Sequence, residues 1–156
     1  MNDKSINHFV FYNKLKSYLV ISFLGILAGL LVAFFDLFPY DDFWGLALFS
    51  HETIGFWIFT CSLITLFSSK NYIAGIHVGL YVYFMFYITG VYKCFALVNK
   101  GYQTMSYFYN GLWRNLTYGI YPAILCFVLA FVLWHARKNK TIFIVFRFLP
   151  LLFILV

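Results

Sequence analysis

Residues 36–57 read DLFPYDDFWGLALFSHETIGFW and separate two strongly apolar parts of the chain. Pro39 cannot continue a helical hydrogen-bond ladder, so it indicates that the chain turns here. The stretch contains four of the five acidic residues of the protein, namely Asp36, Asp41, Asp42 and Glu52. We interpret it as the crossing between two membrane spans on the outer side of the membrane, and the rest of the topology follows from this assignment.

The overall composition supports a membrane protein. Of the 156 residues, 63% are apolar and 10% are charged, whereas soluble domains have about 45–50% apolar and about 25% charged residues. A small water-soluble fold would expose too much of this apolar surface. The aromatic content of 24% suits the boundary between lipid and water. We therefore predict an all-α, polytopic bundle of membrane helices, located in the plasma membrane.

Five apolar runs are expected to form membrane helices. Their bounds are 18–35, 53–67, 72–92, 118–134 and 141–156. The first run ends in Phe34-Phe35-Asp36 without a small-x-small cleavage site, so we expect a retained anchor. The last run would reach only about 24 Å as a helix. We expect either that it ends inside the membrane or that the full-length chain continues beyond Val156.

Segments between these runs define the expected topology. Residues 1–17 form a cytoplasmic or interfacial tail, and residues 36–52 and 93–117 form the two outer crossings. Basic residues favour the cytoplasmic side of a membrane. With the N-terminus inside, the cytoplasmic side carries seven of them, namely Lys4, Lys14, Lys16, Lys70, Arg137, Lys138 and Lys140, and the outer side carries three, namely Lys93, Lys100 and Arg114. This distribution favours the N-in orientation.

Glu52 allows two interpretations. If one helix covers residues 43–67, Glu52 lies near the middle of the membrane, which costs roughly 2.5–3.5 kcal/mol on insertion scales. If residues 43–50 instead form a short re-entrant or interfacial segment, Glu52 lies near the outer boundary, where it can interact with a helix N-terminus. The second interpretation is favoured because it avoids a buried charge. His51 and Asp36 belong to the same acidic region and are further candidate binding residues.

Two polar residues inside apolar runs are candidates for a binding role. Arg147 lies within the run 141–156, and an arginine at such a position marks a functional site by default. Alternatively, its side chain extends toward the inner boundary and bonds helix-end carbonyls. His77 is expected at a similar depth in the run 72–92. The competing interpretation of His77 is a hydrogen bond to a neighbouring helix.

Glycine pairs predict close helix contacts. Gly25 and Gly29, and likewise Gly75 and Gly79, lie one helical turn apart, and such faces let helices approach closely in lipid. We expect packing between the runs 18–35 and 72–92, and a second possible use of these faces is contact with another membrane subunit or another copy of the chain. The lipid bilayer is the expected environment.

Function follows less directly from the sequence. The polar residues inside the predicted membrane spans favour a small-solute carrier or a membrane-embedded substrate-binding unit. The glycine faces and aromatic outer segments favour a non-catalytic accessory or assembly subunit of a membrane complex. A remote alternative is a membrane thiol enzyme using Cys61 and His77. The sequence favours a non-catalytic protein, because it contains no catalytic, nucleotide-binding or metal-binding motif. We expect no cofactor, no metal and no nucleic-acid partner.

Overall fold

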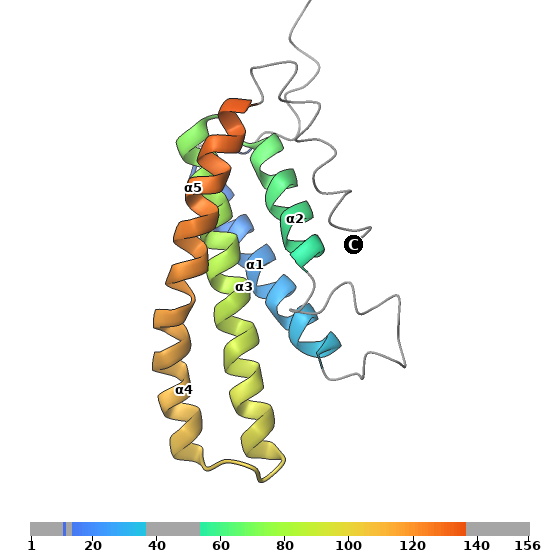
Figure 1. The fold of residues 1–156 in the computed structure, drawn as a ribbon, viewed down its shortest axis with the longest axis vertical. Coiled ribbons are helices and arrows are strands. Elements are labelled where there is room, and N and C mark those ends of the chain that lie inside the picture. Colours follow the sequence, from blue (N-terminus) through green and yellow to red (C-terminus); the bar gives the residue numbers. More distant parts are fainter. Residues whose placement is uncertain (1–10, 12–13, 37–53, 137–156) are drawn as a thin grey trace, which may run out of the picture.

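The computed structural model describes residues 11, 14–36 and 54–136, and the secondary-structure elements in these ranges are all α-helices (Figure 1). The helices are α1 (Leu15–Phe35), α2 (Ile54–Phe67), α3 (Asn71–Asn99), α4 (Met105–Tyr118) and α5 (Ile120–Ala136). Within these ranges the only extended pairing is a single bridge between Phe11 and Ser68. The predicted all-α class is confirmed for this part of the chain.

Three helical stretches are long and apolar enough to cross a membrane, and they are Leu15–Phe35, Asn71–Asn99 and Met105–Trp134. At a helical rise of ~1.5 Å per residue they are about 32, 44 and 45 Å long, against a hydrocarbon core of ~30 Å. Large apolar side chains cover their outward faces, with Leu19 and Leu125 each 61% exposed. A continuous surface of this kind is stable in lipid rather than in water. The chain is an integral membrane protein of the helical type.

α3 is the central helix, and it contacts each of the other four. Its contact with α1 is very close, because a Cβ atom on Gly25 or Gly29 would lie 2.6 Å from the carbonyl oxygen of Tyr81 or Met85, respectively. The Thr89 hydroxyl of α3 also donates a hydrogen bond to the Gly29 carbonyl at 3.0 Å. Small residues thus bring the two backbones together, as expected for helices in lipid.

The other glycine pair faces a different helix. A Cβ atom on Gly75 would lie 2.9 Å from the Phe127 ring of α5, and one on Gly79 would lie 3.5 Å from the Ala123 carbonyl oxygen. Gly75 and Gly79 therefore pack against α5 and not against α1. Both glycine faces contact helices of the same chain. Their use in contact with another subunit or another copy stays a prediction.

Most of the segment 93–117, which is predicted to be an outer crossing, is helical. α3 continues through Lys93 to Asn99, since lysine is a good helix former and does not end a helix. Gly101, with a φ of 75°, allows the turn into α4. α4 then runs back along the last turns of α3 (Figure 1), and the close approach of its Gly111 to Cys94 depends on the missing side chain.

α4 and α5 are almost continuous but are interrupted at Gly119. The Gly119 N–H still bonds the Asn115 carbonyl at 3.0 Å, and the Ala123 N–H reaches the Gly119 carbonyl at 3.4 Å. Pro122 has no N–H, so the Tyr118 carbonyl loses its regular helical donor. This break lies beside the middle of α3.

Candidate functional site

A cavity of about 420 Å³ lies beside the break between α4 and α5. This volume is within the range of about 300–1,000 Å³ typical of small-molecule sites. Its walls come from α1, α2, α3 and the α4–α5 junction, and most of its lining atoms are apolar. The lining residues are Val32, Trp57, Met85, Phe86, Thr89, Gly90, Lys93, Asn115, Tyr118, Gly119 and Pro122.

A few polar groups interrupt the apolar lining. The Trp57 ring packs edge-on against Phe86, with centroids 4.4 Å apart. Its Nε1–H is buried and has no hydrogen-bond partner among the described residues. The Thr89 hydroxyl is already used, because it donates to the carbonyls of Gly29 and Met85 at 3.0 and 2.9 Å. A mainly apolar cavity with a few hydrogen-bonding groups is the usual form of a ligand site.

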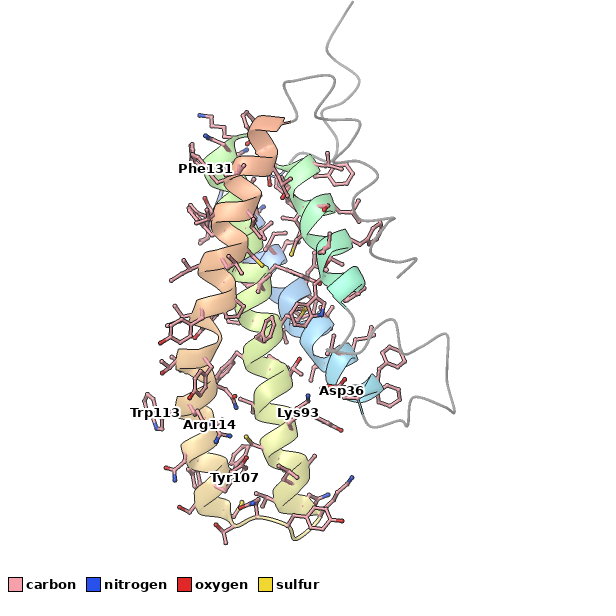
Figure 2. All side chains as sticks on the ribbon, in the orientation of Figure 1. Asp36, Lys93, Tyr107, Trp113, Arg114 and Phe131 are labelled. Atoms are coloured by element: carbon pink, nitrogen blue, oxygen red, sulfur yellow. The ribbon has the colours of Figure 1, made fainter. Side chains whose placement is uncertain are left out.

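Lys93 at the edge of the cavity forms an ion pair with Asp36. The Lys93 ammonium of α3 lies 3.0 Å from the Asp36 carboxylate at the end of α1, and the two side chains lie at the same level of the bundle (Figure 2). The Asp36 side chain is 9% exposed and the Lys93 side chain 40%. A carboxylate at a helix C-terminus is unfavourable for the helix dipole. Lys93 offsets this charge and joins α1 to α3.

Arg114 adds a second cation at this level of the bundle (Figure 2). Its guanidinium lies 3.2 Å from the Tyr107 hydroxyl, to which it donates a hydrogen bond, and 3.9 Å from the Cys94 sulfur. The neighbouring Asn115 lines the cavity, and its amide nitrogen lies 3.6 Å from the same sulfur. Among Asp36, Lys93 and Arg114, the two cations exceed the single acid by one charge.

Two of the predicted site residues, Asp36 and His77, lie in the described ranges. Asp36 is bound to Lys93, which follows His77 by 16 positions on α3, or about 24 Å of helix. The structure therefore does not bring Asp36 and His77 together. His51, Glu52 and Arg147 lie outside the described residues, so their assignments stay predictions.

His77 is fully buried in a junction at the opposite end of the bundle. Its Nδ1 atom lies 3.5 Å from the Ser68 hydroxyl, and its ring centroid lies 5.5 Å from that of Phe11 and 5.0 Å from that of Tyr18. The Ser68 carbonyl accepts a hydrogen bond from the Trp134 indole at 3.1 Å. This junction ties the turn between α2 and α3 to α1 and α5, which favours a structural role for His77.

The thiol pair considered from the sequence receives no support from these contacts. Cys61 packs against the apolar core of the bundle, as does Cys126 of α5. Ser68, Phe11 and Tyr18 surround the His77 ring instead.

The cavity residues Lys93, Trp57 and Asn115 were not predicted from the sequence. Lys93 was counted only as a charge that sets topology, and Trp57 only as part of an apolar run. One available signal was the spacing Gly119-Ile-Tyr-Pro122, which combines two residues that weaken a helix near the start of a span. Such interruptions within membrane helices often accompany binding sites.

Comparisons with known proteins give no further guide to this site. No protein-family model, curated protein or solved structure matches this chain. Among the described residues, no group of three or more His, Cys, Asp or Glu side chains could hold a metal ion.

Proposed function

We propose that this protein is a membrane-embedded binding unit for a small, mostly apolar molecule and that it serves in a small-solute carrier of the plasma membrane. The cavity beside the α4–α5 break is the observation that carries the proposal. It has the volume of a small-ligand site and is lined by four separate helical segments. A break in a membrane helix beside such a cavity is a feature that transporters share.

The proposed topology has five spans with the N-terminus inside, as the distribution of basic residues favours. Lys70 precedes α3 and would lie at the inner boundary, and Lys93 would lie at the outer one. The 23 residues between them correspond to about 35 Å of helix, close to the ~30 Å hydrocarbon core. In this topology the cavity lies in the outer half of the membrane, directly below Lys93 and Asp36.

Binding can be measured through Trp57, because its indole lines the cavity. The background protein carries Trp44→Phe and Trp113→Phe, so that fluorescence comes from Trp57 and Trp134. A medium-chain bromoalkane derivative quenches an indole that it touches. We expect saturable quenching, and we expect it to disappear when Trp57→Phe is added, because Trp134 lies in the junction at the opposite end of the bundle.

A matched pair of variants tests whether the cavity itself is the site. Val32→Phe adds volume at a buried position of the cavity wall, whereas Val128→Phe makes the same change on the exposed face of α5. The first variant should abolish quenching and the second should retain it, with equal helicity by circular dichroism. Unsaturable quenching that is the same in both variants would show partitioning into detergent or lipid and would refute the proposed site.

The second candidate function is that of an accessory subunit of a membrane complex. It is favoured by exposed aromatic residues on the α3–α4 hairpin, where Trp113 is 75% and Tyr109 60% exposed. Aromatic anchors of this type are enriched at protein interfaces. The test is the size of the complex extracted from native membranes in mild detergent. A smaller complex after Trp113→Ala and Tyr109→Ala would support the accessory role, and an unchanged size would leave the binding unit as the better assignment.

A further inference from the structure

We propose that an exposed stripe along α4 binds the phospholipid headgroups of the outer leaflet, so that the α3–α4 hairpin lies within the headgroup layer and not in water beyond it. The stripe consists of Met105, Tyr109, Trp113 and Leu116, all of which are exposed. None of these four residues lines the cavity. The inference rests on the proposed function only for the orientation of the chain in the membrane.

The stripe residues share one face of α4. They are separated by four, four and three positions, and side chains at such intervals lie above one another on a helix. The opposite face of α4 packs within the chain. The Phe108 ring lies against that of Phe95 of α3, with centroids 6.2 Å apart, and Gly111 lies close to Cys94. The stripe therefore points away from α3 and is open to the surroundings.

The same face continues along α5. Ile120 and Ile124 follow Leu116 at intervals of four positions, and both are exposed. α4 and α5 belong to one stretch, Met105–Trp134, that is apolar and long enough to cross a membrane. Exposed apolar side chains on such a helix contact the acyl chains of the bilayer. The lipid-facing surface of α5 thus leads directly into the stripe, which favours lipid over a protein as the partner.

The length of the hairpin matches the thickness of the headgroup layer. Arg114 lies at the level of Lys93 (Figure 2), which marks the outer boundary of the hydrocarbon core in the proposed topology. Tyr109 precedes Trp113 by about 6 Å of helix, and Met105 precedes it by about 12 Å. A bilayer is about 40–45 Å thick with its headgroups and about 30 Å without them, so each headgroup layer measures about 5–8 Å. Trp113 and Tyr109 therefore fall within this layer, and Met105 falls at its outer surface.

The chemistry of the stripe suits this layer. Tryptophan and tyrosine combine an apolar ring with a hydrogen-bonding group, and they are enriched where acyl chains meet headgroups. The sequence from Lys93 to Tyr118 contains no acidic residue, so no carboxylate of the hairpin repels the phosphate groups. The Arg114 guanidinium already bonds the Tyr107 hydroxyl. Binding to the headgroup layer does not require a free cation, because the aromatic side chains supply the contacts.

The test measures depth by site-directed spin labelling of the full chain in phosphatidylcholine vesicles. The native cysteines are changed to serine, and a nitroxide is attached to Tyr102→Cys, Tyr109→Cys, Trp113→Cys or Val128→Cys. Collisions with oxygen, which concentrates in the bilayer, are compared with collisions with a water-soluble nickel chelate. Tyr102 lies in the turn of the hairpin and Val128 on the exposed face of α5, so they are the controls for water and for hydrocarbon.

We expect positions 109 and 113 to give depths between those of the two controls, with position 113 up to about 6 Å deeper than position 109. Leu116→Cys replaces Trp113→Cys if the latter fails to insert into vesicles. Because Leu116 belongs to the same stripe, its label should lie up to about 10 Å deeper than the label at position 109.

The outcomes separate this inference from the proposed function. Nickel collisions at positions 109 and 113 as frequent as at position 102 would place the hairpin in water and overturn the inference. Protection of both positions from both reagents would overturn it as well, because it would indicate a covering protein, as the accessory role requires. In these two cases a label at position 128 that still reports hydrocarbon would leave the binding unit standing. Nickel access at position 128 would refute the membrane span itself, and with it the binding unit.

Discussion

Gly29→Ala should loosen the contact between α1 and α3, whereas Gly79→Ala should leave the contact between α3 and α5 intact. A Cβ atom on Gly29 would lie 2.6 Å from the Met85 carbonyl oxygen, and ordinary contact begins at 3.4 Å. The two backbones must therefore separate by the difference, 0.8 Å. On Gly79 the nearest atom would already be 3.5 Å away, so no movement is required.

The free-energy cost of Gly29→Ala can be estimated from these distances. Overpacking costs about 1–3 kcal/mol, and loss of the Thr89 hydrogen bond to the Gly29 carbonyl would add about 1 kcal/mol. The higher helix propensity of alanine stabilises the variant by about 1 kcal/mol, so the net destabilisation is about 1–3 kcal/mol. For Gly79→Ala only the propensity gain applies, so the expected change is about 0–1 kcal/mol of stabilisation.

The assay is reversible unfolding of the purified protein in mixed micelles, followed by circular dichroism, with both variants compared with the parent. The two substitutions are chemically identical and lie in the same type of glycine pair, so each controls for the other. Equal destabilisation by both variants, or a stable Gly29→Ala protein, would refute the assignment of these glycine faces to their respective partner helices.

Two further predictions concern the outer end of the bundle. Asp36→Asn removes the carboxylate that lies 3.0 Å from the Lys93 ammonium, so the free energy of unfolding in mixed micelles should fall by about 1 kcal/mol; an unchanged value would contradict a role of this ion pair in joining α1 to α3. A cysteine at the exposed Tyr102, introduced after the native cysteines are changed to serine, should react with a membrane-impermeant thiol reagent added outside, whereas one at the buried Ile73 should not. Protection of position 102 in intact cells, with labelling only after lysis, would contradict the proposed orientation.

The sequence predicts where apolar helices occur but not where they end. Hydropathy locates α1, α2 and α5 as helices, with bounds within a few residues of those in the structure. It does not show that α3 continues to Asn99 or that α4 begins at Met105, because the residues of these two stretches are polar and aromatic rather than continuously apolar. These residues are helical all the same, because the contacts between α3 and α4 stabilise the hairpin; Gly111 of α4, for example, lies close to Cys94 of α3.

The candidate site could be predicted only in part. Asp36 was recognised as a candidate because acidic residues are rare in this chain, but its partner Lys93 is 57 positions later and no local pattern connects them. A cavity is an even harder feature to predict, because it depends on which side chains fail to fill a space. That property follows from the packing of several helices and not from the order of residues within any one of them.

Glycine allows close contacts at two levels of this bundle. At Gly25 and Gly29 the missing side chain brings two helices into contact and excludes any space between them. Gly90 and Gly119 line the cavity, and a Cβ atom on Gly119 would lie 3.2 Å from the Asn115 carbonyl oxygen. The Asn115 carboxamide packs directly against Gly90. A Cβ atom on Gly90 would lie only 2.5 Å from the carboxamide oxygen. The Asn115 side chain can therefore reach the cavity, since α3 carries no side chain at Gly90.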